Sequence, residues 1–323
     1  MRLGFIRFFL AVYYSLFFSD SNRLENTTVN IKFPHNASWV ILSPIEQRIK
    51  EKIEKVGVPL KDWEDIRINY GIKTGCNEAF IIDKAKKDEL IRQSPNSVDI
   101  IRPILRGKDI KKYGYNFAEL YLLFIPWHFP LHNNKDIVGA SQEAEKAFQQ
   151  EYPAIYSHLL QYKTQLSNRN KAETGIRYEW YALQRFGSNY MDDFSKPKII
   201  FQEIVQEGQF MLDTKGEFFC NDTGRIITGK AIKFLVGILN SKLFFFAIKY
   251  FYGGGLLGGS GVRMKHTFFE DFPCLKENIQ IKTLVGEVLE SKNITEILQK
   301  IDHKIYELYG LTNDECDFIE NSN

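Results

Sequence analysis

The chain has 323 residues and a mass of 37.7 kDa, enough for one large domain or two smaller ones, with the 44% hydrophobic and 25% charged content of an ordinary globular protein. Four scattered cysteines without a C-x-x-C pair argue against a disulfide framework or a zinc site, and they predict reduced thiols and a cytoplasmic location. The net charge of +2 hides nine Lys/Arg against four acids in residues 84–112 and five Lys against ten acids in 276–323, which predicts one face that meets a polyanion.

The first 56 residues contain an apolar stretch and one clear helix. Residues 8–18 are apolar, but they are too short to span a bilayer and no signal cleavage site follows, so we interpret 1–38 as a linker from an upstream segment. "SPIEQRIKEKIEKVG" predicts a helix that begins after the N-cap Ser43, has a capping box with Glu46 and stops at Gly57. "DIRINYGIKTG" predicts a strand ending in a glycine-bounded turn, and "AFIID" its neighbour.

The middle of the chain alternates predicted strands and helices. "IIRPILRGKDIKKYGY" predicts a short apolar piece broken by Pro103 and followed by a basic loop, and residues 141–169 predict helices on both sides of Pro153. "KPKIIFQEIV", "GQFMLD" and "GEFFC" predict strands joined by glycine turns. "TGKAIKFLVGILNSKLFFFAIKYF" predicts one long buried helix capped by Thr228, and the tail predicts two amphipathic helices ending at Gly310.

The stretch "YGGGLLGGSG" contains a literal G-x-G-x-x-G at Gly253, Gly255 and Gly258. A dinucleotide-binding loop of this kind needs a strand before it and a helix after it. Here a predicted helix precedes the glycines and "VRMKHTFF" follows as an extended segment, so the flanks are reversed. A nucleotide- or S-adenosylmethionine-dependent enzyme using Gly253–Ser260 stays as the alternative interpretation.

The sequence offers no convincing catalytic centre. It has no G-x-S-x-G elbow and no Pro-Pro pair, so it lacks the Asn/Asp/Ser-Pro-Pro-aromatic turn that grips a flipped adenine. The acids Asp192, Asp193 and Glu203 could form a metal-dependent nuclease set, but the adjacent aspartates precede a turn and are interpreted as a solvated pair. His128 and His132 are interpreted as loop residues. We therefore expect no catalytic residue, cofactor or metal in this chain.

Three clusters of basic and aromatic residues predict a nucleic-acid-binding surface, because Lys and Arg neutralise phosphates and aromatic rings stack on bases. For each cluster alone, a solvated face with a few core aromatics is the competing interpretation. The clusters are Arg102, Arg106, Lys108, Lys111 and Lys112 with Tyr113 and Tyr115; Arg177 and Arg185 with Tyr178, Trp180 and Tyr181; and Arg263, Lys265 and His266.

Several long segments in order resemble one family. They are "WVILSPIEQRIKEKIEKVGVPLKDWEDIRINYGIKTGCNEAFIID", "IIRPILRGKDIKKYGY", "YMDDFSKPKIIFQEI", "ILNSKLFFFAIKYFYGGG" and "IDHKIYELYGLTNDE". Together they resemble the TaqI-like C-terminal specificity (target recognition) region of type IIG restriction–modification enzymes. The resemblance implies an α/β (mixed α+β) target recognition domain over 39–273, with a twisted mixed sheet flanked by helices, followed by C-terminal helices over 274–323.

The resemblance also implies what the chain works with. In that family the region reads a short sequence in double-stranded DNA, while an upstream N6-adenine methyltransferase domain, which a nuclease domain can precede, carries the chemistry. S-adenosylmethionine and Mg are expected only for those upstream domains, and no membrane is expected. Because this sequence shows neither domain, it looks like the recognition portion, either a separate specificity subunit or an inactive remnant of a split gene, with 1–38 where the methyltransferase connection would arrive.

The family motifs add candidate residues without giving the recognised bases. "GIKTG" adds Lys73 and Thr74, and "RGKDI" contains Arg106 and Lys108. From charge and position we expect Lys73, Arg106, Lys108 and Lys112 near the DNA backbone. Base reading is expected from Trp180, Arg185, Arg263 or Lys265.

Overall fold

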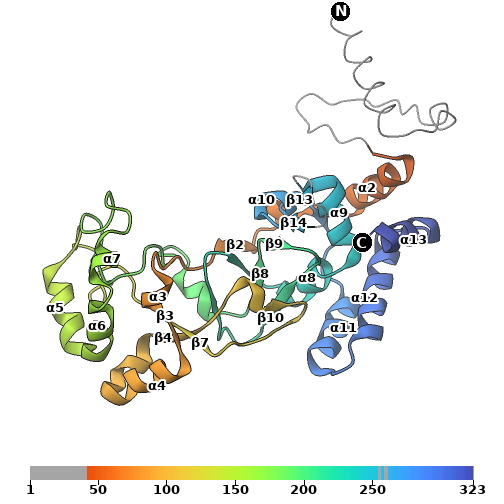
Figure 1. Ribbon diagram of the computed structural model, residues 1–323. Helices are drawn as coiled ribbons and strands as arrows, with labels where there is room; N and C mark the ends of the chain where they lie inside the picture. Colours follow the sequence, from red (N-terminus) through yellow and green to blue (C-terminus); the bar gives the residue numbers. More distant parts are fainter. Residues whose placement is uncertain (1–41, 254–255, 258–260, 323) are drawn as a thin grey trace, which may run out of the picture. The chain divides into compact units, whose positions relative to one another are not determined.

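The computed structural model describes residues 42–253, 256–257 and 261–322, and it gives no side-chain detail for 254–261 (Figure 1). The chain divides into a unit of residues 1–51 and a unit of residues 52–323, each of which is described by itself. The predicted N-terminal linker and most of the glycine stretch therefore lie outside the described residues. The predicted boundary at residue 273 stays a prediction.

The capping box at the start of the first described helix is confirmed. Helix α2 spans Pro44–Val56, and the backbone N–H of Ser43 donates to the Glu46 carboxylate (2.7 Å) while that of Glu46 donates to Ser43 Oγ (3.4 Å). Two of the backbone N–H groups left free at a helix start are satisfied in this way.

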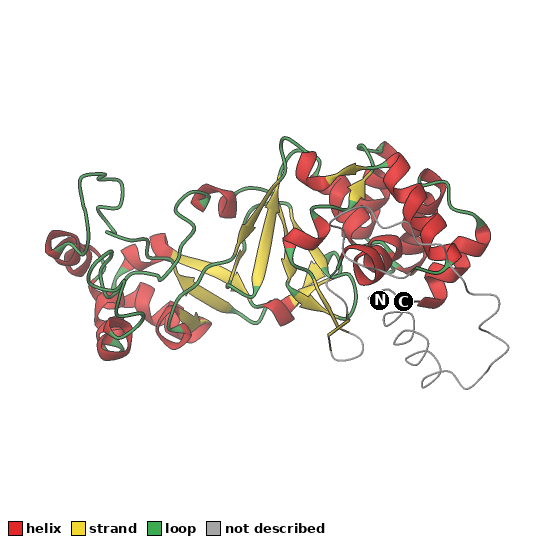
Figure 2. Cartoon of the chain, turned by 90° about the horizontal axis from the view of Figure 1, so that it is seen from above, coloured by secondary structure: helices red, strands yellow, loops and turns green. Residues whose placement is uncertain are grey.

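The following elements of the larger unit combine helices and short strands, which confirms the mixed α+β class. Figure 2 shows helices on both sides of the strands within residues 52–323. The helices are α3 (Asn77–Phe80), α4 (Lys84–Gln93), α5 (Gln142–Glu151), α6 (Pro153–Leu160), α7 (Lys163–Ser167), α8 (Ile232–Leu239), α9 (Lys242–Ala247), α10 (His266–Phe269), α11 (Ile279–Glu290), α12 (Thr295–Leu308) and α13 (Asn313–Ser322). The strands are β1 (Val58–Pro59), β2 (Arg67–Tyr70), β3 (Ile81–Asp83), β4 (Ile101–Leu105), β5 (Ile110–Lys111), β6 (Gly114–Tyr115), β7 (Leu120–Leu123), β8 (Lys198–Gln202), β9 (Ile204–Val205), β10 (Phe210–Asp213), β11 (Phe219–Cys220), β12 (Gly224–Thr228), β13 (Leu256–Leu257), β14 (Gly261–Arg263) and β15 (Pro273–Cys274).

Two four-stranded sheets form the centre of this unit. One is antiparallel throughout, in the order β10-β8-β12-β2. The other has the order β11-β4-β7-β3 and is mixed, because β11 pairs with β4 in parallel. Smaller sheets join β13, β14 and β9, β5 with β6, and β1 with β15.

The antiparallel sheet is buried on both faces, which explains its continuous apolar runs. Ile200, Met211 and Ile226 face a core shared with β4, β7 and the helices α3 to α6. The neighbouring positions Phe201 and Phe210 face the other way, and their rings contact that of Phe269 of α10 at centroid distances of 5.3 and 6.3 Å. Alternate residues of one strand thus join two cores.

The structure corrects the predicted single helix over 228–251. Thr228 ends β12 instead of capping a helix, and the segment breaks into α8 and α9, the latter continued by a π-helical turn over Ile248–Tyr252, with a bend of 62° between them. The break lies at Asn240, whose side chain both accepts from the N–H of Phe210 (3.0 Å) and donates to its carbonyl (2.7 Å). Ser241 Oγ then caps α9 at Phe244 N–H. A bond to a distant strand therefore decides where the helix stops.

Five smaller predictions also need correction. Pro103 does not break its apolar piece but lies inside β4, where pairing with β7 ends and pairing with β11 begins at Ile104. "AFIID" is half helix and half strand, the extended segment after Arg263 turns into α10, and a further helix, α13, follows Gly310. Asp193 is 3% exposed rather than solvated, and its carboxylate accepts from Lys196 (2.8 Å) and Asn69 (3.0 Å).

Across residues 42–253, 256–257 and 261–322, no single helix is long and apolar enough to cross a bilayer. Only the bent pair Ile232–Leu239 with Lys242–Tyr252 passes that test, by length and composition.

Candidate nucleic-acid interface

One end of the antiparallel sheet gathers most of the candidate residues. The register pairs Gly224 with Gln202 and Arg225 with Tyr70, so β8 and β2 end where β12 begins. Phe210, the first residue of β10, pairs with Phe201 at the same end. The loops that leave these strands therefore start from a common edge, which we call the sheet edge.

The "GIKTG" turn follows β2 at this edge, and its two glycines are required by geometry. A Cβ on Gly71 would lie 1.9 Å from the carbonyl oxygen of Asn221, and Gly75 has a φ of +76°, a conformation that favours glycine. Lys73 between them forms an antiparallel bridge with Arg185, with N–H···O distances of 3.0 and 2.9 Å. The turn thus brings together two cations that lie 112 positions apart in the sequence.

Lys73 and Arg185 are available to an external anion. Arg185 is exposed and Lys73 is half-buried, and neither side chain has a hydrogen-bond or ion-pair partner among the described residues. Two adjacent unpaired cations repel each other unless an anion lies between them. This pair therefore suits a phosphate.

A buried arginine that the sequence analysis missed holds this pair in place. Arg169 is 7% exposed, and its guanidinium donates to the carbonyls of Leu166 (3.1 Å), Trp180 and Ala182 (2.8 Å each), and to that of Thr74. Burial lowers its pKa, but an arginine stays protonated. It joins the "GIKTG" turn to the segment leading to Arg185. A lone arginine in a polar stretch gives no sequence signal for such a role.

The "RGKDI" turn also packs at the sheet edge. Gly107 lies against Gln202, since a Cβ there would be 2.9 Å from the Gln202 side chain. Arg106 is engaged internally: its Nε and Nη2 each donate to the Asp109 carboxylate at 2.8 Å, and although burial opposes it, this bidentate contact lowers the pKa of Asp109. Lys108 is exposed and has no partner in the described part of the chain. Lys108, rather than Arg106, is the free cation of this turn.

The other basic candidates of this segment differ in availability. Arg102 donates to the carbonyls of Asp99 (2.6 Å) and Ile101 (3.1 Å), and burial lowers its pKa, which indicates a structural role. Burial likewise lowers the pKa of Lys112, despite the opposing charge of Asp302. Lys111, at the end of β5, is half-buried and its amine has no partner among the residues described. Arg102 is therefore engaged by the backbone, whereas Lys111 is free to contact DNA.

Three candidates are buried, which corrects their predicted contact with DNA. Tyr178 has no exposed surface, and its ring stacks on Trp127 at 4.8 Å. Trp180 is 8% exposed and donates its indole N–H to Glu145 (2.7 Å). Thr74 is 3% exposed, and its hydroxyl donates to Asn77 (2.6 Å) at the start of α3. These side chains stabilise the scaffold.

The segment after the glycines reaches the same edge. β14 pairs with β9, which follows β8 directly, so Arg263 lies opposite Ile204. The Arg263 side chain is 45% exposed, with Nε 3.4 Å from Glu203 Oε1. Lys265 is half-buried, its amine 5.7 Å from the ring centroid of Phe268. The predicted extended segment is thus brought to the sheet edge by strand pairing.

The glycine stretch does not have the surroundings of a cofactor loop. The π-helical turn ending at Tyr252 precedes it, and the described parts of the stretch, β13 and β14, pair antiparallel. A phosphate-binding glycine loop runs instead from a strand into a helix. The described flanks therefore do not support the alternative use of Gly253–Ser260.

The described residues also offer little to a metal. No group of three or more His, Cys, Asp or Glu among them could hold one. Glu203 of the imagined nuclease set is taken by Arg225 and Arg263. His128, a loop residue as predicted, contacts the buried Glu179 through Nδ1 (2.9 Å), and Glu179 also accepts the N–H of His128 and of Ser141. This carboxylate holds two loops together through these three contacts.

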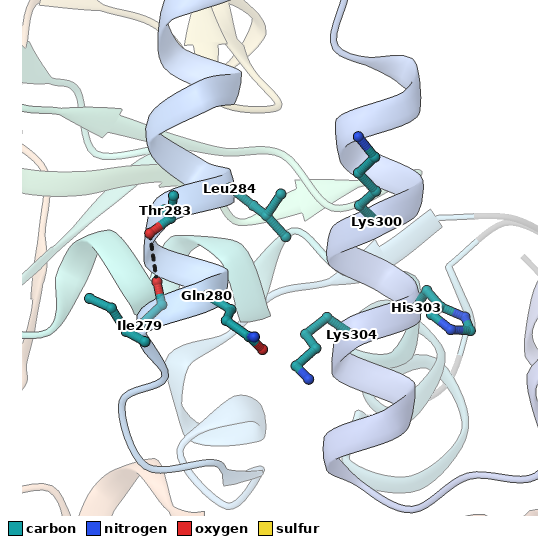
Figure 3. Close-up of a pocket in the computed structure, with 7 residues that line it drawn as sticks. All are labelled: Ile279, Gln280, Thr283, Leu284, Lys300, His303 and Lys304. Atoms are coloured by element: carbon teal, nitrogen blue, oxygen red, sulfur yellow. Dashed lines mark hydrogen bonds between the residues drawn. The ribbon is translucent and has the colours of Figure 1, made fainter.

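Two hollows lie away from the sheet edge. One of about 250 Å³ is lined by Ser141, Glu145, Glu179 and Trp180. The other, of about 480 Å³, is lined by Ile279 and Leu284 of α11 and by Lys300, His303 and Lys304 of α12, and the Leu284 side chain points toward α12 (Figure 3). Its one drawn hydrogen bond, from Thr283 Oγ1 to the Ile279 carbonyl, is internal to α11. In the first hollow the Ser141 hydroxyl oxygen accepts from the Ala144 N–H (3.1 Å) and so caps α5.

Comparison with known proteins shows a family similarity in the middle of the chain. Residues 102–255, a little under half of the chain, match the family model described as the TaqI-like C-terminal specificity domain. The matched range includes the "RGKDI" turn, Arg169, Arg185 and β8 to β12, which form much of the sheet edge. No curated protein sequence matches the chain.

Solved structures show where this fold occurs. The type IIL restriction–modification enzyme MmeI, solved in complex with DNA, aligns with a TM-score of 0.54 and 15% identity over 82% of this chain and 36% of its own. The type IIG restriction endonuclease BpuSI aligns with a TM-score of 0.49 and 12% identity over 86% of this chain and 33% of its own. The chain spans about a third of the length of either enzyme. At 15% identity the likeness to MmeI concerns the fold alone.

Proposed function

We propose that this chain is the DNA-recognition portion of a type II restriction–modification system. It binds a short sequence in double-stranded DNA and directs an N6-adenine methyltransferase and endonuclease partner, of the type IIG kind, to that site. The observation that carries the proposal is the sheet edge, where Lys73, Arg185, Lys108 and Lys111 have no partners in the described structure. The match to a specificity domain supports the same assignment.

The geometry favours binding over catalysis. The cations at the sheet edge converge from three loops, and the acidic groups near them are engaged by arginines. Phosphate contacts of this kind fix the position of a protein on DNA, while other side chains read base edges. S-adenosylmethionine and Mg belong to the partner in this proposal. The four cysteines are free thiols, as a reducing compartment requires, and we place the complex in the cytoplasm.

A salt series tests the proposal. Fluorescence anisotropy with a random-sequence duplex should show an affinity that falls linearly in log[salt], because each neutralised phosphate releases counterions with a slope of about −0.9. Replacing Lys73 and Arg185 by alanine should make the slope shallower by about 2. The control, Lys276→Ala with Lys300→Ala, removes two exposed lysines from the C-terminal segment and should leave the slope unchanged. Absence of binding at low salt would exclude the function.

The partner can be sought directly. The reading frame upstream of this gene should encode an Asn/Asp/Ser-Pro-Pro-aromatic turn and a glycine-rich cofactor loop, and its product should methylate adenine at one sequence only in the presence of this chain. Methylation with the same sequence preference in its absence would contradict the directing role.

A further inference from the structure

Four side chains from four segments form a continuous row at the sheet edge. Tyr70 ends β2, Arg225 pairs with it from β12, Glu203 lies between β8 and β9, and Arg263 ends β14. The guanidinium carbon of Arg225 lies 4.0 Å from the Tyr70 ring centroid, its Nη2 lies 2.7 Å from Glu203 Oε2, and the other Glu203 oxygen lies 3.4 Å from Arg263 Nε. We call this set the arginine row.

Exposure rises from Arg225 through Glu203 to Arg263, while Tyr70 at the other end of the row is exposed. The side chain of Arg225 is 8% exposed, that of Glu203 20% and that of Arg263 45%. Arg225 is fixed from below, since its Nη1 donates to the carbonyls of Asp222 (3.0 Å) and Gly224 (3.1 Å). The inner arginine therefore holds the carboxylate, and the carboxylate holds the outer arginine.

The contact with Glu203 leaves the two Nη groups of Arg263 open. The ion pair joins Nε to Glu203, and no hydrogen bond from either Nη group to a described residue is found. A guanidinium is planar, so a carboxylate beside Nε favours an orientation in which the Nη donors remain open. Arg106 differs, because its bidentate bond to Asp109 consumes one Nη, and Arg102 spends its Nη groups on carbonyls.

The row also contains a polar atom that the protein does not satisfy. Arg225 Nε is buried and is the side-chain atom among those described for which no hydrogen-bond partner is found. Such an atom costs free energy, and its persistence calls for a reason other than stability. Holding Glu203 in one orientation supplies that reason.

We infer that Arg263 reads a guanine in the DNA site, with Glu203 and Arg225 as positioning residues. Guanine presents two acceptors, O6 and N7, on its major-groove edge, and a pre-oriented arginine fork donates to both. Each oxygen of Glu203 faces an arginine, so the carboxylate is engaged within the row. Tyr70, which is 50% exposed, lies against Arg225 at the end of the row opposite Arg263. The inference rests on the proposed function, since it deepens the same interface.

Selection of binding sites from random DNA tests the role of Arg263 separately from the proposed DNA-recognition function. The full-length chain is incubated with a pool of duplexes carrying a randomised segment, and the bound sequences of wild type, Arg263→Lys, Glu203→Gln and Arg177→Lys are compared. Wild type should select a site containing a guanine. Arg263→Lys keeps the charge and loses the fork, so it should lose that guanine preference by roughly tenfold to a hundredfold while keeping the salt slope. Arg177, an exposed arginine of another loop, is the matched control and should keep the preference.

An analogue identifies the atom that is read. Replacing the selected guanine by 7-deazaguanine removes N7 and should weaken wild type but not Arg263→Lys. Glu203→Gln should also lower the guanine preference while the thermal midpoint stays within a degree or two of wild type. A preference that is identical in wild type and Arg263→Lys overturns the inference alone, whereas a wild type that selects no sequence overturns the proposed recognition function as well.

Discussion

Removing the guanidinium of Arg169 should destabilise the contact between the "GIKTG" turn and the segment that leads to Arg185. Arg169→Met keeps the length of the side chain but leaves the carbonyls of Leu166, Thr74, Trp180 and Ala182 without their donor. Buried acceptors that lose a charged donor typically cost about 3–5 kcal/mol in total. With a urea dependence of about 3 kcal/mol per M, the unfolding midpoint should fall by about 1–1.7 M.

The assay has a structural and a functional readout. Tryptophan fluorescence in urea follows unfolding, and anisotropy measures duplex binding below the transition, where the misplaced Lys73 and Arg185 should weaken affinity. Arg177→Met is the matched control: this arginine is 61% exposed and makes a single ion pair with Glu173 at 3.6 Å, so it should change stability by less than about 0.5 kcal/mol. Equal midpoints for Arg169→Met and Arg177→Met would refute the role assigned to Arg169.

Three further predictions concern the scaffold below the sheet edge. Lys198→Met alone should lower the free energy of unfolding by about 3–5 kcal/mol, because it leaves the buried Asp213 carboxylate without the amine 2.6 Å away. Lys198→Met combined with Asp213→Asn should recover part of that stability in urea unfolding. Equal losses in the single and double variants would contradict the pairing. Burial raises the pKa of Asp302 in the folded state. The free energy of unfolding should therefore fall as pH rises from the unfolded carboxyl pKa of about 3.9 through the raised folded pKa, and Asp302→Asn should abolish that fall. Thermal midpoints measured across this pH range test it, and an unchanged pH dependence in Asp302→Asn would contradict the role of Asp302. Asn240→Ala should lower stability by about 1–3 kcal/mol because the Phe210 backbone loses both of its partners, and an unchanged thermal midpoint would show that the helix break has another cause.

Features that depend on neighbouring residues could be predicted from the sequence. The capping box of α2 needs only the spacing from Ser43 to Glu46, and the break before Pro153 needs only the missing N–H of proline. The mixed fold class likewise follows from the alternating apolar patterns. Such features are decided within a few residues, so a single sequence contains them.

Features that depend on distant partners could not be predicted. The long apolar run at 232–251 reads as one helix until Asn240 meets the backbone of β10. Tyr178 and Trp180 look like stacking residues beside Arg177 and Arg185, yet the fold buries both rings. Arg225 and Arg169 gave no signal, because their importance lies in contacts with carbonyls and carboxylates far along the chain.

The number of basic residues in the sequence likewise does not show which of them are free to contact DNA, and a salt series can measure this. If all nine Lys and Arg of residues 84–112 neutralised phosphates, the slope of log affinity against log[salt] would be about −8. The structure engages several of them: Lys86 contacts Glu89 at 2.6 Å, Arg106 is held by Asp109, and Arg102 bonds to backbone carbonyls. A paired cation has little charge left to displace counterions.

The free cations of the sheet edge give a different slope. Lys73, Lys108, Lys111 and Arg185 predict about −4, since each contributes about −0.9. A measured slope near −8 would mean that the internal ion pairs open on DNA, and the rigid arrangement described for Arg106 and Asp109 would then not survive binding. A slope near −4 that becomes shallower when Lys108 is replaced, and not when Arg106 is, would show that the structure, rather than the charge composition, sets how strongly this surface holds DNA.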